Sequence, residues 1–311
     1  MRPTCPTAPV LLLIFNRPDT TSKVLEAIGR AAPSRLFVAA DGPRRGNSSD
    51  VDLCSRTLDV VHKGISWECD VRYLVREGNL GCGRAPAGAI SWFFEHVEEG
   101  IILEDDCFAA DAFFPFCTSL LARYRNEPRV AHIGGFNCQL GKMRGDASYY
   151  FSRIFHCWGW ATWKRAWAGF DFDMTDYAAF LAEGGLEKLF SDDSLQDFWR
   201  GNFDSAANGD GSIWDYQWVY KNLKEACLAA VPNWNMIENI GFGKDATHTS
   251  RRRSLMPDIA HGIPSEITHP RSIVPDLAAD EFTYRTHMKM GPWHRAKRIV
   301  KKVLRPLIFR P

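Results

Sequence analysis

The chain has 311 residues, of which 45% are hydrophobic and 24% charged, and its formal net charge at pH 7 is +1. These values are typical of a globular protein of one large or two moderate domains, and the balanced charge excludes a general attraction for nucleic acid. The nine cysteines contain no C-x-x-C pair, which argues against a disulfide framework or a zinc site. No apolar stretch reaches the ~20 residues of a membrane span. We therefore expect a cytoplasmic protein.

The first half of the sequence alternates short apolar runs with segments whose apolar residues recur at helical spacing. The runs predict strands and the segments predict helices. The expected strands are residues 10–15, 36–40, 71–75 and 101–103, and the expected helices are residues 19–29, 51–62 and 81–98. This βαβαβαβ order predicts an α/β fold with a mostly parallel central sheet flanked by helices.

The second half is less regular. Residues 130–135 predict a fifth strand, and eight of the eleven tryptophans fall between Trp158 and Trp234. We expect most of these tryptophans to pack in the core, although such a face can also stack on a sugar ring. From Pro257 onward, prolines and polar residues predict a loosely ordered segment.

The C-terminal tail, residues 293–310, carries seven basic side chains and no acidic one, with apolar residues between them. A basic amphipathic stretch of this kind suits an anionic membrane surface, which would make the protein peripheral to the inner membrane. A solvated or disordered terminal helix is an equally open interpretation.

Polar residues gather at the ends of the predicted strands. In parallel sheets ligands bind at the carboxyl ends of the strands, and those ends carry Asn16-Arg17, Asp41-Gly42, the stretch from Asn79 to Arg84, and Glu104-Asp105-Asp106. Three carboxylates after a buried strand would repel one another and lose hydration, so a divalent cation is the simplest compensation. A solvated acidic turn is the alternative. Because no glycine-rich phosphate loop follows the first strand, we expect Mg²⁺ or Mn²⁺ to meet the charge of a nucleotide diphosphate.

Two later segments also suggest chemistry. Asp215 lies among bulky aromatic residues, where it is either a structural hydrogen-bond acceptor or a positioned general base. Residues 239–249 combine glycines, a lysine, a histidine and hydroxyls. This composition fits a loop that closes over a diphosphate, and a plain surface loop is the alternative.

Together these motifs resemble those of GT-A glycosyltransferases. The chain is similar to the N-acetylglucosaminyltransferase I family and to bacterial family-2-like sugar transferases. The matching segments are residues 16–21, Asp41, residues 104–106 with 111–114, residues 158–167, residues 214–218 and residues 241–248, in the same order over roughly residues 9–250.

The resemblance implies a role for each matched residue. Asp106 would ligate the metal, Glu104 and Asp105 would hold the donor sugar and ribose, and Asp215 would be the catalytic base. The other donor-binding residues would be Arg17, Asp41 and Arg84 near the nucleotide, and Lys244 and His248 in the closing loop.

The resemblance also implies a fold and an activity. We expect a GT-A, Rossmann-like domain over residues 1–255, with a nucleotide-binding half (9–108), an acceptor half (109–255) and a C-terminal extension (256–311). The expected function is that of a metal-dependent inverting hexosyltransferase, moving a sugar from a nucleotide-sugar donor, UDP-sugar favoured, to a glycan, lipid-linked or protein acceptor in bacterial polysaccharide biosynthesis. The alternatives are a sugar-nucleotide nucleotidyltransferase and an inactive sugar-nucleotide-binding module.

Overall fold

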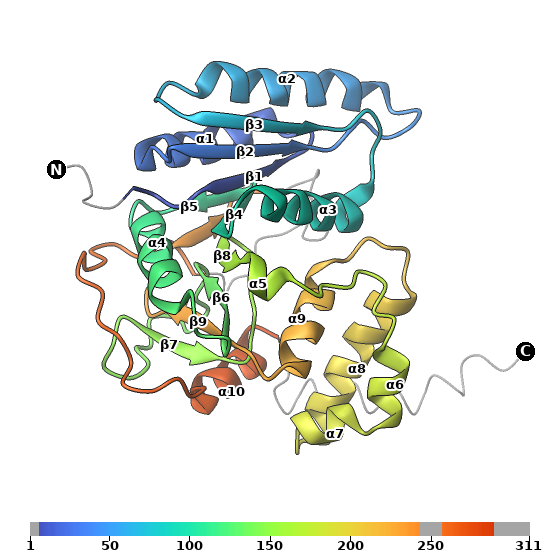
Figure 1. Cartoon of the computed structure of the whole chain (residues 1–311), viewed down its shortest axis with the longest axis vertical. Coiled ribbons are helices and arrows are strands. Elements are labelled where there is room, and N and C mark those ends of the chain that lie inside the picture. The colour runs from blue at the N-terminus through green and yellow to red at the C-terminus, as the bar shows by residue number, and fades with distance from the viewer. Residues whose placement is uncertain (1–5, 243–256, 289–311) are drawn as a thin grey trace, which may run out of the picture.

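The computed structural model of the chain describes residues 6–242 and 257–288 (Figure 1). All seven elements predicted for the first half are confirmed. They are β1 (Val10–Ile14), α1 (Pro18–Ala31), β2 (Arg35–Ala40), α2 (Ser48–Gly64), β3 (Asp70–Val75), α3 (Gly81–His96) and β4 (Glu99–Glu104). Helix α1 begins at Pro18, whose fixed φ favours the first helical turn. Arg17 is therefore the N-cap residue, placed between the end of β1 and the helix.

The second half adds shorter elements. They are β5 (Cys107–Ala109), α4 (Phe113–Tyr124), β6 (Val130–Gly134), β7 (Tyr149–Ser152), β8 (Trp160–Trp163), α5 (Lys164–Trp167), α6 (Tyr177–Ala182), α7 (Gly185–Leu189), α8 (Asp193–Asn208), α9 (Asp215–Lys224), β9 (Leu228–Pro232), β10 (Ile237–Asn239) and α10 (Leu277–Thr286). The predicted fifth strand is confirmed as β6. Strand β5 pairs antiparallel with β10 in a separate small sheet.

The central sheet has eight strands in the order β3-β2-β1-β4-β8-β6-β9-β7. Strands β8 and β7 run against their neighbours, and the other six share one direction. The prediction of an α/β fold with a mostly parallel sheet is thus confirmed.

The strand order places the switch point of the sheet between β1 and β4. The chain moves outward from β1 to β2 and β3, and then returns through α3 to β4 on the other side of β1. Because parallel crossovers are right-handed, α1 and α2 cover one face of the sheet and α3 covers the other (Figure 1). Ligands of open α/β sheets bind outside the carboxyl ends of the strands at such a point.

The tryptophan-rich region packs as predicted. The indoles of Trp160, Trp163, Trp199 and Trp218 are almost fully buried, and only Trp158 and Trp234 of that region are partly exposed. The prediction of a loosely ordered segment after Pro257 is wrong for residues 277–286. They form α10, which buries Ala279, Thr283 and Tyr284. Sequence analysis missed this helix because it is short and lies in a segment rich in prolines and polar residues.

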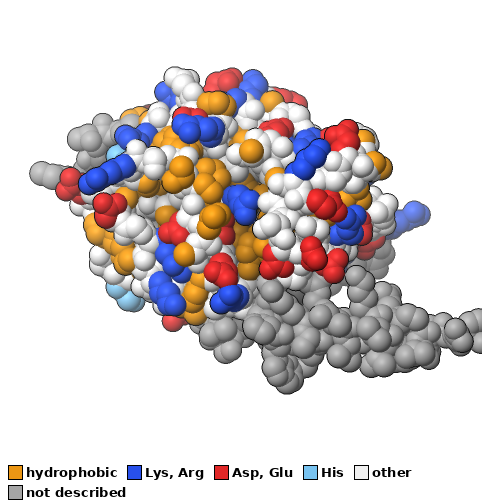
Figure 2. Space-filling model, turned by 90° about the horizontal axis from the view of Figure 1, so that it is seen from below, with side chains coloured by type: hydrophobic (Ala, Val, Ile, Leu, Met, Phe, Trp, Pro, Cys, Tyr) orange, Lys and Arg blue, Asp and Glu red, His pale blue; other side chains and the backbone are white. Residues whose placement is uncertain are grey.

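The surface and the helices of the described residues add two observations. On the face in Figure 2, acidic and basic side chains are interspersed, so no field of one sign covers that face. No helix within residues 6–242 and 257–288 is long and apolar enough to cross a membrane. The predicted boundary at residue 255 and the basic tail lie outside the described residues, and the domain division and the membrane contact stay predictions.

Candidate functional site

The centre of the candidate site is an ion pair across the switch point. Arg17 follows β1 and Asp106 follows β4, and the guanidinium Nη1 lies 2.6 Å from Asp106 Oδ2. The same nitrogen lies 3.8 Å from Asp105 Oδ1. Asp105 Oδ2 also accepts a hydrogen bond of 3.1 Å from the backbone N–H of Phe15, at the end of β1. Two chain segments that are far apart in sequence thus meet where a parallel sheet binds its ligand.

One guanidinium faces three carboxylates at this point. Asp105 and Asp106 are buried and Glu104 is partly buried. Burial, with the charges of Asp106 and Asp105, raises the pKa of Glu104 well above its usual range. Burial and the charge of Asp106 raise the pKa of Asp105 to about 7. The predicted need for a compensating cation is therefore met only in part by Arg17.

The segment after β10 lies directly on Asp106. The side chain of Asn239 donates a 3.3 Å hydrogen bond to Asp106 Oδ1, and the N–H of Ile240 donates one of 2.8 Å to the Asp106 carbonyl. Gly241 lies so close that an added Cβ would be 2.2 Å from Asp106 Oδ2. The first residues of the predicted closing loop are thus fixed to the acidic cluster. Lys244 and His248, the predicted ligands in this loop, lie outside the described residues.

Gly241→Ala should lower the free energy of unfolding by about 1–3 kcal/mol, because the new methyl group overlaps a carboxylate that Arg17 holds in place. Urea denaturation of purified protein measures the loss. Gly201→Ala on α8 is the matched control, since its Cβ would meet nothing within 4 Å. Equal stability of the two variants would show that Gly241 does not need its close approach to Asp106.

Asp41 connects the end of β2 to the start of α3. Its carboxylate accepts hydrogen bonds from the backbone N–H groups of Gly42, Leu80 and Gly81 and from the side chain of Asn79, at 2.9–3.2 Å. Burial raises the pKa of Asp41, and these backbone hydrogen bonds act in the opposite direction. The carboxylate thus orders the turn beside the candidate site, and its predicted contact with a base stays a prediction.

Asp50 is a buried carboxylate beside the candidate site whose partners sequence analysis did not predict. It is 1% exposed, and Arg44 binds it through Nε at 2.6 Å and Nη2 at 2.9 Å. Asn16, directly after β1, donates a further hydrogen bond of 2.9 Å. These contacts, that with Arg44 foremost, lower the pKa of Asp50 to about 2. In the sequence Asp50 reads as an ordinary acid in the first turn of a helix, which explains why its partners were not anticipated.

Asp215, at the start of α9, belongs to the same electrostatic neighbourhood as the acidic cluster. Its charge contributes to the raised pKa of Glu104. Burial, followed by the charges of Asp215 and Glu104, raises the pKa of the Cys157 thiol. Asp215 therefore lies within electrostatic range of Glu104, beside the contacts of Arg17 with Asp105 and Asp106, and its catalytic role stays a prediction.

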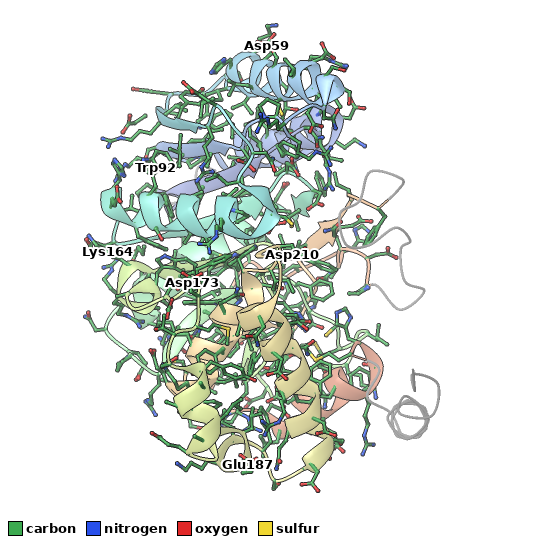
Figure 3. The ribbon with its side chains drawn as sticks, turned by 90° about the vertical axis from the view of Figure 1, so that its right-hand side faces the viewer. Asp59, Trp92, Lys164, Asp173, Glu187 and Asp210 are labelled. Carbon is green, nitrogen blue, oxygen red and sulfur yellow. The ribbon has the colours of Figure 1, made fainter. Side chains whose placement is uncertain are left out.

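Arg84 has different partners from those predicted for a nucleotide ligand. Its guanidinium lies 2.8 Å from Asp173 and 4.4 Å from the centre of the Phe172 ring. Figure 3 shows Asp173 and Asp210 next to α3, where the loop before α9 approaches that helix. In this approach Gly83 has no room for a side chain, because a Cβ would be 2.0 Å from the carbonyl oxygen of Gly211.

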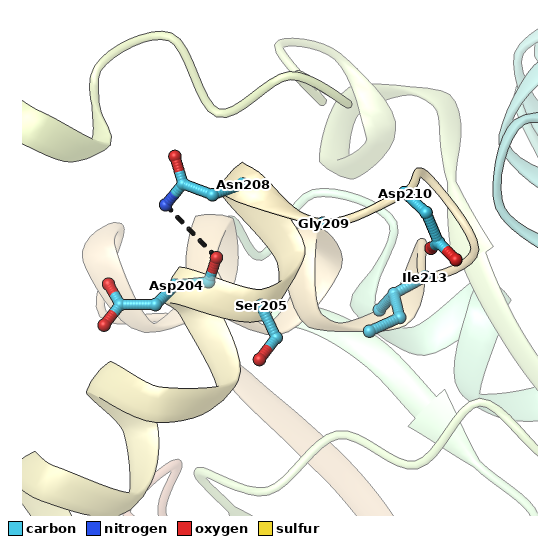
Figure 4. Close-up of a pocket in the computed structure, with 6 residues that line it drawn as sticks. All are labelled: Asp204, Ser205, Asn208, Gly209, Asp210 and Ile213. Atoms are coloured by element: carbon cyan, nitrogen blue, oxygen red, sulfur yellow. Dashed lines mark hydrogen bonds between the residues drawn. The ribbon is translucent and has the colours of Figure 1, made fainter. Parts of the chain in front are cut away.

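A cavity of about 810 Å³ lies at the end of α8 and includes this loop (Figure 4). It is lined by Asp204, Ser205, Asn208, Gly209, Asp210 and Ile213. Asn208 donates a hydrogen bond of 3.2 Å to the carbonyl of Asp204, within the cavity wall. Of the predicted site residues that the structure describes, none lines this cavity.

The donor set at the acidic cluster fits a hard divalent cation in one respect. Carboxylate oxygens are the ligands that Mg²⁺ and Mn²⁺ prefer. Among the described residues, no three His, Cys, Asp or Glu side chains surround a common metal position. Such a cation would therefore be held by one or two carboxylates together with phosphates and waters, which is the usual arrangement for Mg²⁺.

The chain is similar to known proteins in structure but not in sequence. No protein-family model matches the chain, and no curated protein sequence is similar to it. HddC from Yersinia pseudotuberculosis, also solved with GMP-PN, aligns at 11% identity over 51% of this chain and 77% of its own, with a TM-score of 0.32. The inositol-1-phosphate CTP transferase of T. maritima aligns at 10% identity over 73% and 86%, with a TM-score of 0.36. A UDP-glucose pyrophosphorylase with UDP-glucose aligns at 13% identity over 47% and 62%, with a TM-score of 0.29.

These comparisons correct the main functional prediction. The named activities are those of a CTP transferase and a pyrophosphorylase, which correspond to the alternative of a sugar-nucleotide nucleotidyltransferase. The prediction of a glycosyltransferase is therefore wrong, and the resemblance to the N-acetylglucosaminyltransferase I family finds no support among them. With TM-scores below 0.5, the likenesses assign no ligand and no catalytic residue to this chain.

Proposed function

We propose that the chain binds a nucleotide sugar at the carboxyl ends of β1 and β4 and transfers a nucleotidyl group between a nucleoside triphosphate and a sugar phosphate. The observation that carries this proposal is the Arg17–Asp106 pair of 2.6 Å at the switch point of the sheet. When all four groups are ionised, one guanidinium and three carboxylates leave two negative charges at a ligand-binding edge. A divalent cation that bridges to phosphate oxygens would balance that charge.

The proposed reaction is a displacement at the α-phosphorus. A phosphate oxygen of the sugar phosphate forms the new P–O bond, and the bond to the β-phosphate breaks, so that pyrophosphate leaves with the electron pair. A bound cation would neutralise charge that develops on the phosphates. Arg17 can turn from Asp106 to the pyrophosphate, since a guanidinium binds phosphate as well as carboxylate.

This reaction removes the need for the general base predicted at Asp215. The second pKa of a phosphate monoester is about 6, so the nucleophile is already ionised near neutral pH. In the proposal Asp215 and Glu104 accept hydrogen bonds from sugar hydroxyls, and Asp105 and Asp106 hold the cation. Arg84, Lys244 and His248 remain proposed contacts of the nucleotide or its phosphates.

Incubation of the purified chain with a nucleotide sugar, Mg²⁺ and ³²P-pyrophosphate should produce the labelled nucleoside triphosphate, because the transfer is reversible. UDP-, CDP- and GDP-glucose are tested in parallel, and the product is separated by thin-layer chromatography. EDTA should abolish the signal, and Arg17→Gln should weaken it at least about 10-fold through the loss of a charge-assisted contact. Binding of a nucleotide sugar without any exchange would contradict nucleotidyl transfer and leave only the binding module.

A further inference from the structure

Two histidines face each other near the carboxyl end of β6. The rings of His156 and His287 have centroids 5.4 Å apart and are perpendicular. Phe136 touches both, at 5.2 and 5.5 Å, and contacts Trp158 at 5.0 Å. Phe136 is buried, whereas His156, Trp158 and His287 are partly exposed. We call these four residues the imidazole–aromatic cluster.

The segment that carries His156 is held rigidly. The indole N–H of Trp218 donates to His132 Nδ1 at 3.2 Å, so the other ring nitrogen of His132 donates to the His156 carbonyl at 3.1 Å. Burial lowers the pKa of His132 to about 3, which keeps this ring neutral and the arrangement fixed. His156 itself lies 3.7 Å from the Cys138 thiol.

His287 comes from a distant part of the chain. It follows α10, and its N–H donates to the Thr283 carbonyl at 2.9 Å. The hydroxyl of Thr283 in turn binds the side chain of Gln139 at 2.8 Å. The segment predicted to be a loose extension thus supplies one of the two imidazoles.

The imidazole–aromatic cluster adjoins the acidic cluster through residues 157–159. The Cys157 thiol experiences the charges of both Asp215 and Glu104. A Cβ at Gly159 would lie 3.3 Å from the side chain of Leu103, the residue before Glu104, and the Gly159 carbonyl accepts a hydrogen bond from the N–H of Gly135. A ligand seated on His156 and Trp158 would therefore reach toward the proposed transfer centre.

The chemistry of the cluster fits a phosphorylated sugar. Two facing imidazoles can donate hydrogen bonds to a phosphate, and an indole face can stack on the apolar face of a sugar ring. Burial and the charge of His287 lower the pKa of His156, and a bound phosphate dianion would oppose both effects.

We propose that His156, His287 and Trp158 form the subsite for the sugar phosphate, with its phosphate on the two imidazoles and its ring on the indole. This proposal rests on the proposed function and assigns a binding site to its second substrate. The probes are glucose 1-phosphate and inorganic phosphate, and the protein is the full chain.

Calorimetry with each probe should show binding, and His287→Gln should weaken the affinity for both probes at least about 10-fold. His62→Gln, on the exposed face of α2 against Tyr73, is the matched control and should bind as wild type. Trp158→Ala should lower the affinity for glucose 1-phosphate more than the affinity for inorganic phosphate. In long-range ¹H–¹⁵N spectra, phosphate should shift the ring signals of His156 and His287.

The outcomes separate this proposal from the proposed function. Absence of phosphate binding to the wild-type chain, or equal affinity of wild type and His287→Gln for both probes, would overturn the subsite. His287→Gln should keep its affinity for nucleoside triphosphate. If the wild-type chain binds phosphate but catalyses no pyrophosphate exchange, nucleotidyl transfer is overturned. The phosphate subsite would then still stand.

Discussion

Asp106→Ala should abolish the cation-dependent part of nucleotide binding. In the proposal Asp106 is the carboxylate at the switch point that meets both the cation and Arg17, which now lies 2.6 Å away. Substitution of residues that only orient metal ligands already costs 10–100-fold in metal affinity. We therefore expect the Kd for a nucleotide sugar in the presence of Mg²⁺ or Mn²⁺ to rise by about 100-fold or more.

The measurement is isothermal titration calorimetry with and without EDTA. Asp111→Ala provides the matched control, because Asp111 is an exposed aspartate nearby in sequence that pairs with Arg30. The alanine variant should also fold, since removal of one of three crowded carboxylates relieves repulsion. An affinity that is unchanged, and equally sensitive to EDTA, would remove Asp106 from the cation site.

The sequence predicted which strand ends carry the candidate site residues, but not how those strands pair. Hydrophobic runs located β1 and β4, and the acids after β4 were evident from the printed residues. The contact between Arg17 and Asp106 spans 89 positions and exists only because β4 returns to the side of β1. Local patterns contain no information about that order, although the right-handed crossover rule makes it one of few possibilities.

His287 of the imidazole–aromatic cluster shows a second limit of prediction from sequence. His287 follows a helix of ten residues whose buried face includes the polar side chains of Asp280 and Thr283. Its stability comes from tertiary contacts, among them the buried Asp280, which accepts a hydrogen bond from Ser152 at 2.5 Å. A helix that depends on such contacts resembles a loop in sequence, because short helices are marginal on their own.

The incorrect functional prediction has a related cause. Acids, arginine and a closing loop at the carboxyl edge of a sheet describe how a nucleotide diphosphate is held. They do not state which bond of the bound nucleotide breaks, because that depends on the atom placed opposite the leaving group. Asp215 illustrates the ambiguity. In a glycosyltransferase it would act as a base toward the acceptor hydroxyl, whereas in the proposed reaction it would accept a hydrogen bond from a hydroxyl of the sugar.

Asp105→Asn should stabilise the protein at alkaline pH. Asp105 is 7% exposed and lies between Asp106 and the Phe15 N–H. Burial and the Asp106 charge raise its pKa from 3.8 to about 7 in the folded chain. A raised carboxyl pKa means that the folded state binds the proton more tightly than the unfolded state does, so that ionisation disfavours folding.

The sign and the pH window follow from these two values. Well below pH 3.8 the carboxyl is protonated in both states and costs nothing. As the pH rises from 3.8 to about 7, only the unfolded state releases the proton, and the free energy of unfolding falls. Above about pH 7 the full loss is reached, which is at most roughly 4 kcal/mol. Asparagine keeps the shape and the acceptor for the Phe15 N–H without the charge.

Urea unfolding with EDTA, measured from pH 4 to pH 8, tests this expectation. The stability of wild type should decline relative to that of Asp105→Asn across the whole interval, with the largest difference at pH 8. Asp111→Asn, at an exposed carboxyl, should follow wild type. Parallel curves for wild type and Asp105→Asn would show that Arg17 already neutralises Asp105. In that case the cluster would carry too little excess negative charge to recruit a cation, and the proposed nucleotide site would lose its electrostatic basis.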